Sequence, residues 1–420
     1  MPDRESQTQT IGRLPPLATG GGGKAFGAVA YTLFILLTGT NLPTPLYRGY
    51  ERAFGYSALV TTLIFAVYVA VLVPALLVAG PLSDAMGRRR VLLPSLVLAI
   101  AGSLAFAFAS STAWLFAARI LQGLAVGAAS GALTAALSEF EPTGNRHRAA
   151  LVATAVSLGG LGAGPLIAGM LAQYEPAPYV VPFALEIILL IPAMIFVIAL
   201  PEKAARTKWR PRRPSIPPTM RHAFAASGSA NFLAFSVIGL FLSLVPAYVM
   251  KLSATSNLAI AGGTVTLMLA CSVVAQMIGY GRSPLRLQIG GLGLLSIGLT
   301  LLAVAGHLSS LPLLILASAM AGVGHGMTFL GGLTEINRLA PPDRHAETVS
   351  SFYVIVYLGV GVPVIGVGLL STIAGSLAAV QIFTAFIVPL SLIALSLLVM
   401  SRRRLEKALD ASRQLQERKA

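Results

Sequence analysis

Charged residues and cysteine are both scarce in this sequence. Of its 420 residues only 11% are charged, and Asp and Glu together number 15. With 55% hydrophobic residues and a mean hydropathy of +0.79, the chain has more apolar surface than a water-soluble core can bury. Cys271 is the only cysteine, which excludes an intrachain disulfide and a cysteine metal cluster. We therefore expect an all-α membrane protein without metal or cofactor.

Apolar runs long enough to cross a bilayer recur along nearly the whole chain. A membrane-spanning helix needs about 20 mostly apolar residues, and the sequence predicts twelve such helices in two six-helix bundles. The predicted spans are Ala25–Leu46, Ala58–Ala79, Val91–Ala109, Ala113–Leu137, Ala149–Ala172, Tyr179–Leu200, Ala223–Val249, Leu258–Tyr280, Leu287–Gly306, Leu311–Leu333, Ser350–Thr372 and Leu377–Met400. They divide the chain into a tail (1–24), a first bundle (25–200), a basic linker (201–222), a second bundle (223–400) and a C-terminal tail (401–420).

Lys and Arg outside the predicted spans lie almost entirely on one side. The side that carries the termini and the linker has 26 of them, and the opposite side has only Arg48, Arg52 and Lys251. This is the positive-inside bias, so we expect both termini in the cytoplasm. The Arg, Ala and Gly content is typical of a GC-rich bacterial genome, which favours the bacterial inner membrane, the plasma membrane of the cell. A nucleic-acid binder needs its basic residues on a solvated face, so the net charge of +15 does not indicate one.

A weak internal repeat relates the two predicted bundles. Arg146-His147 and Arg344-His345 each precede an apolar segment, and Pro165 and Pro363 lie inside those segments at the same offset of 198 positions. Together with the central linker, these matches predict two related halves that meet at a site in the middle of the membrane, the plan of many secondary transporters.

Residues 80–90, between the second and third predicted spans, read GPLSDAMGRRR. The glycines permit a tight turn, and the acid can pair with the arginines that follow it. This segment closely resembles the cytoplasmic-loop signature of the major facilitator superfamily of membrane transporters. The resemblance implies a charge network that latches the two halves together in the outward-open state, made by Gly80, Asp84, Gly87, Arg88 and Glu139. The alternative is that the arginines only enforce topology.

An arginine lies inside the fourth predicted span. Leu115, Arg119, Gln122-Gly123 and Gly127-Ala128 follow a second pattern of the same superfamily. A charge in a bilayer costs about 2.5 to 3.5 kcal/mol unless it faces a partner or water, so Arg119 needs a reason to be there. We favour a functional or fold-specific role over snorkelling of this side chain to the outer headgroups.

The fifth predicted span contains the run GGLGAGPLIAG from residue 159 to 169. Small residues let helices approach closely, and a proline breaks one backbone hydrogen bond, so a generic packing face would look similar. However, Gly160, Gly164, Pro165 and Gly169 match the spacing of the signature that marks antiporters within the superfamily, with Ala168 in place of one glycine. The resemblance implies a drug and proton antiporter.

Glu186 is the only carboxylate well inside a predicted span, about 10 Å along the sixth helix. Its depth matches that of Arg119. A carboxylate that alternates between a dry and a wet environment can load and release a proton, so we expect Glu186, with Arg119, to take part in proton coupling. A fixed structural pair or an outward-leaning acid is the alternative. His325 is the remaining proton-coupling candidate, because histidine titrates near neutral pH; a neutral packing role is equally consistent with its place in the sequence.

Polar groups that could line a substrate cavity are few. The candidates are Asn41, Gln122, Tyr248, Gln276, Tyr353 and Tyr357. Phosphate esters would need clustered cations, and sugars would need many amides and aromatics, whereas the chain has two tryptophans. We therefore expect a monomeric exporter that exchanges an amphipathic or hydrophobic small-molecule substrate for protons across the lipid bilayer. An importer or facilitator of a small organic nutrient is the alternative. No catalytic constellation indicates a membrane enzyme.

Overall fold

The computed structural model describes residues 22–201, 215–252, 257–341 and 344–417. Most of the predicted tail (1–24) and most of the predicted linker (201–222) therefore lie outside the described residues. Within the described ranges the chain is helical and contains no strand. The first half comprises α1 (Gly22–Asn41), η1 (Thr44–Leu46), α2 (Tyr47–Phe54), α3 (Ala58–Met86), α4 (Arg88–Ala107), α5 (Thr112–Phe140), α6 (Arg146–Tyr174) and α7 (Val181–Ala199).

The second half follows the same plan. It comprises η2 (Pro218–Met220), α8 (Arg221–Ser243), α9 (Val245–Leu252), α10 (Leu258–Gly279), α11 (Pro284–His307), α12 (Leu311–Leu339) and α13 (His345–Glu417). α13 is two helices that meet at Gly375, whose φ of 84° and ψ of 161° are not helical. Eleven helices of the described chain are long and apolar enough to cross a membrane, and the division at Gly375 makes twelve spans. The predicted fold is confirmed.

Several turns differ from the predicted boundaries for local reasons. The predicted loop at residues 80–90 is mostly helical: α3 runs to Met86, α4 starts at Arg88, and Gly87 alone makes the turn at φ 98°. Such a φ favours glycine, because a Cβ would clash there. The predicted first span also ends early. Pro43 and Pro45 lack the N–H that a helix needs, so α1 stops at Asn41 and a 3₁₀ turn leads into α2.

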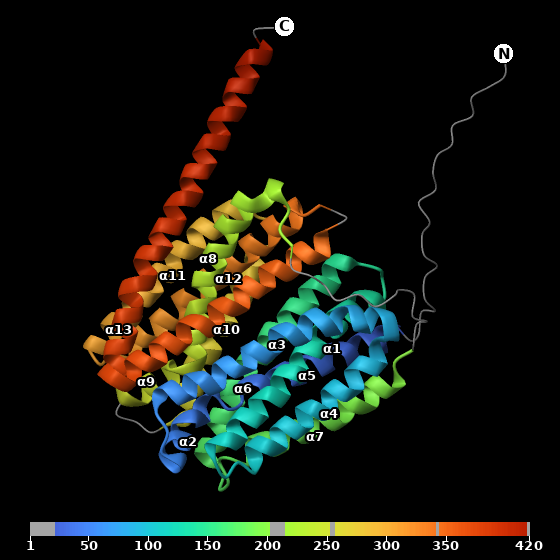
Figure 1. The fold of residues 1–420 in the computed structure, drawn as a ribbon, viewed down its shortest axis with the longest axis vertical. Helices are drawn as coiled ribbons and strands as arrows, with labels where there is room; N and C mark the ends of the chain where they lie inside the picture. The colour runs from blue at the N-terminus through green and yellow to red at the C-terminus, as the bar shows by residue number, and fades with distance from the viewer. Residues whose placement is uncertain (1–21, 202–214, 253–256, 342–343, 418–420) are drawn as a thin grey trace, which may run out of the picture.

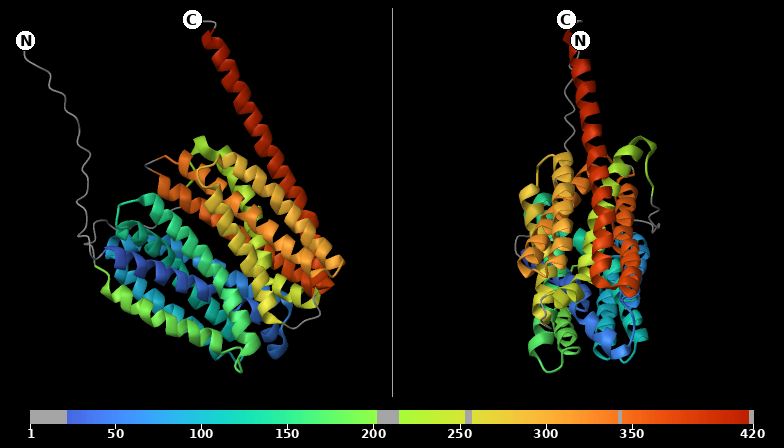
Figure 2. Two further views of the ribbon diagram at one scale, coloured as in Figure 1. Left: turned by 180° about the vertical axis from the view of Figure 1, so that it is seen from behind. Right: turned by 90° about the vertical axis from the view of Figure 1, so that its left-hand side faces the viewer.

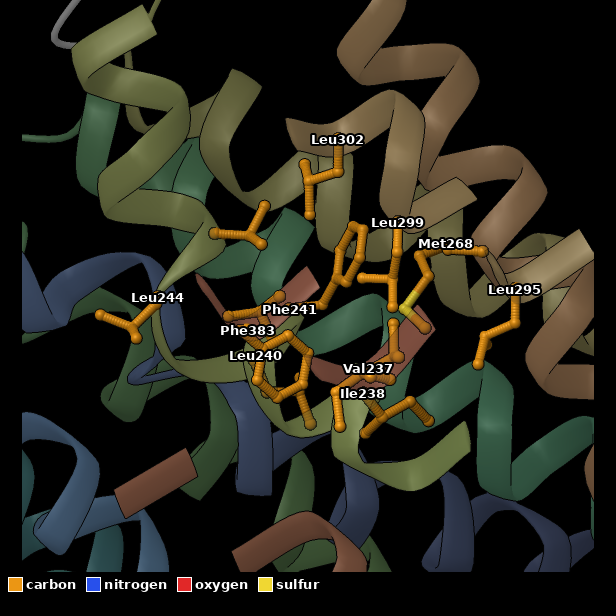
Figure 3. Packing of buried hydrophobic residues seen from close by; sticks show 14 of the residues in the cluster. Val237, Ile238, Leu240, Phe241, Leu244, Met268, Leu295, Leu299, Leu302 and Phe383 are labelled. Atoms are coloured by element: carbon orange, nitrogen blue, oxygen red, sulfur yellow. The ribbon is translucent and has the colours of Figure 1, made fainter. Parts of the chain in front are cut away.

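The two halves form separate groups of helices, blue to green and yellow to red in Figure 1. Each half has its own main hydrophobic core, although Phe65 and Val69 of α3 belong to the core of the second half. Figure 3 shows how Phe241, Met268 and Leu299 interdigitate in that core. The contacts between the halves are made mainly by α6 with α10 and by α3 with α13. Tyr68 and Tyr357 pack against both cores, so they mark the junction of the halves.

The spans alternate in direction, so α1 and α8 start at the face where the chain enters each bundle, and we name the opposite face the far face. The last part of α13 extends beyond the bundle as a single helix, away from the far face (Figures 1 and 2). At the far face, hydrogen bonds run from Leu59 to Thr372, from Leu258 to Gln173 and from Arg48 to Ala247, each joining one half to the other. The far face is therefore closed in this structure.

Candidate functional site

Arg119 on α5 lies at the centre of the first half and has no exposed surface. Its Nε donates to Tyr47 Oη at 2.7 Å, and its Nη1 donates to Thr40 O at 2.6 Å and to Gln122 Oε1 at 2.9 Å. Four aromatic rings surround the guanidinium at 5.4 to 5.8 Å from their centroids, those of Tyr47, Phe65, Tyr68 and Phe106. The side chain therefore does not snorkel: it is held inside the bundle by hydrogen bonds and by cation–π contacts.

One nitrogen of this guanidinium is unsatisfied. Arg119 Nη2 is buried and has no hydrogen-bond partner among the described residues. Burying a donor without a partner costs about 1 to 3 kcal/mol and more for a charged group, so native structures retain such groups mostly where they serve a purpose. The unused donor makes Arg119 a candidate for contact with a moving group.

Glu186 on α7 lies near this arginine and is 4% exposed. Its Oε2 accepts a hydrogen bond from Ser103 Oγ of α4 at 2.7 Å. The ion pairs among the described residues do not include one between Glu186 and Arg119. A buried carboxylate is costly unless it is paired or protonated. Glu186 therefore does not lean outward, whereas a fixed structural pair and a part in proton coupling both stay predictions.

Four helices converge on this carboxylate. Gly39 of α1 faces it so closely that a methyl group at this position would overlap the carboxylate itself. The carbonyl of Gly39 also accepts a hydrogen bond from Gln122 Nε2 of α5 at 3.2 Å. Gln122 thus bridges the arginine and α1, which makes it part of the charged cluster. Displacing α1, α4 or α5 would change the partners of both charged groups.

The residues of the predicted latch meet at the opposite end of the same half. Arg88 donates to Asp84 Oδ1 at 2.6 Å, to Glu139 Oε1 at 2.8 Å and to Ser83 Oγ at 3.0 Å. These contacts tie α3, α4 and the end of α5 together within the first half. Gly80 lies in the body of α3, where its Cα faces Gly131 of α5, and does not form the turn. The predicted role in the outward-open state stays a prediction.

The glycines of the predicted antiporter signature place α6 between α1 and α10. A methyl group on Gly160 would lie 2.6 Å from Phe34 O of α1, and one on Gly164 would overlap Thr38 O. Gly169 faces Leu258 O of α10, and Gly262 of α10 faces Pro165 O. The signature thus lets one helix pack tightly against both its own half and the other half, since small residues allow backbones to approach.

His325 belongs to a different cluster in the second half. It is fully buried on α12, and its Nδ1 lies 2.9 Å from Ser272 Oγ, which also accepts a bond from Gln276 Nε2 at 3.3 Å. Phe235 and Phe329 flank the ring at centroid distances of 4.7 and 6.2 Å. The structure does not bring His325 together with Glu186 and Arg119, because these residues lie in different halves.

The other predicted cavity residues have separate environments. Asn41 Nδ2 donates to Leu161 O of α6 at 3.0 Å, at the junction of the halves. Tyr353 and Tyr357 form a tilted ring pair at 6.4 Å on α13. Tyr248 instead lies in the core of the second half, 1% exposed, with its hydroxyl donating to Leu302 O at 3.2 Å. Tyr248 therefore lies in a packed core, whereas Asn41 and Tyr357 lie at the junction of the halves and Tyr353 lies beside Tyr357.

The sequence did not single out Gly39, Tyr47 or Ser103. Ser103 lies about one turn before the end of α4, a depth similar to that of Glu186 measured by helical rise. Counting every polar residue by depth, instead of only the charged ones, would have found it. Gly39 has no such signal, because a glycine in an apolar span more often serves packing than a site.

Comparison with known proteins decides the family. Residues 28–361 match the Major Facilitator Superfamily. The chain belongs to this superfamily. It is thus a membrane transporter rather than an enzyme, as the sequence predicted.

The relatives and structural neighbours of this chain are named for different compounds or functions. The bacillibactin exporter of Bacillus subtilis (strain 168) is 31% identical over 102 residues, 23% of this chain and 25% of that protein. The D-xylose transporter of Levilactobacillus brevis is 41% identical over 80 residues, 18% of each. The chain thus matches a quarter or less of the length of these two curated relatives. A peptide transporter POT in complex with alafosfalin has a TM-score of 0.76 at 16% identity, covering 93% of this chain and 96% of that one. A bacterial homolog of the human lysosomal transporter Spinster, inward-facing and occupied, has a TM-score of 0.71 at 14% identity, covering 93% and 98%.

Proposed function

We propose that this superfamily member is a proton-coupled exporter of an amphipathic or hydrophobic organic compound, acting as a monomer by alternating access. The observation that carries the proposal is the environment of Glu186. It is buried between four helices, and a serine hydroxyl, not a cation, is its hydrogen-bond partner. A carboxylate in such a site responds strongly to any change in hydration or charge around it.

The neighbours of Glu186 couple its environment to helix movement. Glu186 on α7 contacts Ser103 of α4 and Gly39 of α1, and Arg119 on α5 bonds the next residue of α1, Thr40, and holds an unused donor. If α1 moves relative to α7, the carboxylate loses its fit against Gly39 and gains access to water or to the guanidinium. Proton uptake in one state and release in the other follows from that change of neighbours.

The substrate class follows from the scarcity of polar side chains at the junction of the halves. Tyr68, Leu161 and Tyr357 pack against both cores, and aromatic and aliphatic surfaces of this kind bind apolar rings and chains. The antiporter signature on α6 and the bacillibactin exporter among the relatives agree with export.

Import or facilitated passage of a small organic nutrient is the second candidate. It is favoured by relatives named as a D-xylose transporter and as the glucose transporter GlcP of Staphylococcus epidermidis, which is 35% identical over 96 residues. Inside-out vesicles with an imposed pH gradient separate the two functions. Exporter activity accumulates the fluorescent amphipathic dye ethidium when the lumen is acidic, whereas the nutrient function moves radiolabelled D-xylose or D-glucose. Sugar flux without gradient-driven dye flux would reject the exporter.

Glu186→Gln tests the coupling itself. We expect gradient-driven dye accumulation to be abolished while downhill dye exchange continues, because glutamine keeps the shape and the hydrogen bond but cannot release a proton. Glu175→Gln is the matched control, since Glu175 is exposed after the end of α6. Undiminished uphill transport by Glu186→Gln would exclude this residue as the coupling group.

The cytoplasmic assignment of the termini completes the proposal. The 26 basic residues on the side of the termini support a cytoplasmic near face and an external far face in a bacterial inner membrane. With the far face closed, the structure then corresponds to the inward-facing state. In this assignment the Asp84, Arg88 and Glu139 network lies at the cytoplasmic face, where it would act as a latch once the inner side closes.

A further inference from the structure

The two seams that join the halves at the far face are related by a repeat. In one seam, Gln173 Oε1 of α6 accepts a hydrogen bond from Leu258 N of α10 at 2.9 Å. In the other, Thr372 Oγ1 of α13 accepts one from Leu59 N of α3 at 3.0 Å. The two acceptors are 199 positions apart in the sequence, and so are the two donors. Each half therefore supplies one acceptor and one donor.

Both donors belong to the first turn of a helix, where N–H groups have no partner inside the helix. Ser57, the N-cap of α3, makes no side-chain capping bond, so Thr372 from the other half takes that role. Asn257, the N-cap of α10, accepts from Ala259 and Ile260, and Gln173 supplies the acceptor for Leu258. Each helix is thus partly capped by the other half.

The geometry fixes these side chains as acceptors. The hydroxyl of Thr372 donates its proton to Gly368 O at 3.0 Å, which leaves a lone pair for Leu59 N. Gly368 and Gly169, also 199 positions apart, lie one turn before the two acceptors and face the partner half so closely that a methyl group on either would overlap it. A glycine followed by a polar acceptor therefore recurs in both seams.

We propose that Gln173 and Thr372 form a reciprocal clasp that holds the far face closed and sets how often it opens. When the halves separate at this face, each acceptor loses its donor, and both groups must find water instead. A net hydrogen bond changes an equilibrium by roughly two- to tenfold. The two bonds lie on separate seams, so their effects on the opening equilibrium multiply.

The test measures the opening equilibrium directly and needs no substrate or proton gradient. Nitroxide labels are attached at Ser110→Cys and Leu308→Cys, exposed loop positions of opposite halves at the far face, in a Cys271→Ala background in lipid nanodiscs. Pulsed electron spin resonance then gives the distance distribution. We expect Gln173→Leu and Thr372→Val each to raise the ratio of long to short distances by about two- to tenfold, and the double variant to raise it by the product.

Two further variants keep the result interpretable. Gln173→Glu is expected to lower the long-distance population, because a carboxylate at a helix N-terminus binds more strongly than an amide. Thr300→Val is the matched control, since the hydroxyl of Thr300 bonds only within α11, to Ser296 O, and it should leave the distribution unchanged. If the clasp variants lower the melting temperature but leave the distances as in the control, or if Gln173→Glu opens the face, the clasp is refuted. Such a failure would leave the proposed proton coupling untouched.

Discussion

Glu186 keeps its position through a neighbour that has no side chain. Because Gly39 faces the carboxylate without room for a methyl group, the acid can accept from Ser103 on one side and lie flat against α1 on the other. The buried site therefore depends on the absence of one carbon atom. This dependence is a property of a single residue and can be tested as such.

Gly39→Ala should push the carboxylate away from Ser103. Overpacking of a buried site costs about 1 to 3 kcal/mol, so we expect a lower melting temperature and a loss of gradient-driven transport. Gly27→Ala in the same helix is the control, since a methyl group at that position meets no atom within 4 Å. Equal behaviour of the two variants in thermal unfolding would contradict the packing that we describe.

Glu141 gives a residue-scale prediction outside the membrane. Burial alone would raise the pKa of Glu141, but bonds from the backbone N–H groups of Asn145 and Thr143 and the nearby Arg148 outweigh burial and lower this pKa. A carboxyl with a lowered pKa stabilises the fold above its unfolded pKa, near 4.5, and loses that contribution as the pH falls through the lowered value.

Glu141→Gln should therefore lower the melting temperature at pH 7, and the difference from the native chain should shrink as the pH falls below about 4.5 and vanish once the pH is below the lowered pKa of Glu141. Thermal unfolding in detergent across this range measures the difference. Glu175→Gln, at an exposed position, controls for removal of an acid. If the difference in melting temperature between the native chain and Glu141→Gln stays constant with pH, the ionised carboxylate of Glu141 is not the source of the stabilisation.

At the scale of elements, α6 is the helix that packs closely against both α1 of its own half and α10 of the other half. Its glycines face α1 within the first half and α10 in the second. In a bilayer, helices associate through close van der Waals packing rather than through exclusion of water, so a stripe of glycines determines how near two backbones lie. The same stripe that resembles an antiporter signature thus positions the seam between the halves.

Two adjacent glycines on α10 allow a matched test of the close packing between α10 and α6. A methyl group on Gly262 would overlap Pro165 O of α6, whereas one on Gly263 meets no atom within 4 Å. We expect Gly262→Ala to destabilise the protein by about 1 to 3 kcal/mol, and Gly263→Ala to be neutral or to stabilise it by up to about 1 kcal/mol through helix propensity. Thermal unfolding of both purified variants measures this difference. A Gly262→Ala variant that is more stable than Gly263→Ala would contradict the close packing of α10 against α6.

At the scale of the whole molecule, the charge distribution predicts how the bundle lies in the membrane. A green fluorescent protein fused after Ala420 should fluoresce, because it folds in the cytoplasm, and an alkaline phosphatase fused after Leu308 should be active, because it folds outside. Leu308 lies in the far-face turn between α11 and α12. Inactive phosphatase at Leu308 combined with a dark C-terminal fusion would invert the assignment of the two faces.

The two halves meet mainly along two seams, α6 with α10 and α3 with α13. Both seams use the same spacing of glycine and acceptor, so the far face closes at two symmetry-related places. The charge network of Asp84, Arg88 and Glu139 lies at the other end of the first half. This network joins helices of the first half only, whereas the contacts between the halves are those of the two seams.

The sequence by itself determined the number of spans, their division into halves and the sidedness of the charges, because hydropathy and basic residues act locally and add along the chain. It also pointed to Arg119, Glu186 and the network around Arg88, because a charge in an apolar span is conspicuous. It did not determine which hydroxyl meets Glu186. Serine and threonine in a helix bond by default to a carbonyl one turn earlier, and Ser103 Oγ does lie 3.1 Å from Ala99 O. Its shorter contact, 2.7 Å to Glu186 on another helix, leaves no trace in the sequence. Only the packing of distant helices decided that contact, the place of Gly39 and the reciprocal capping at the far face.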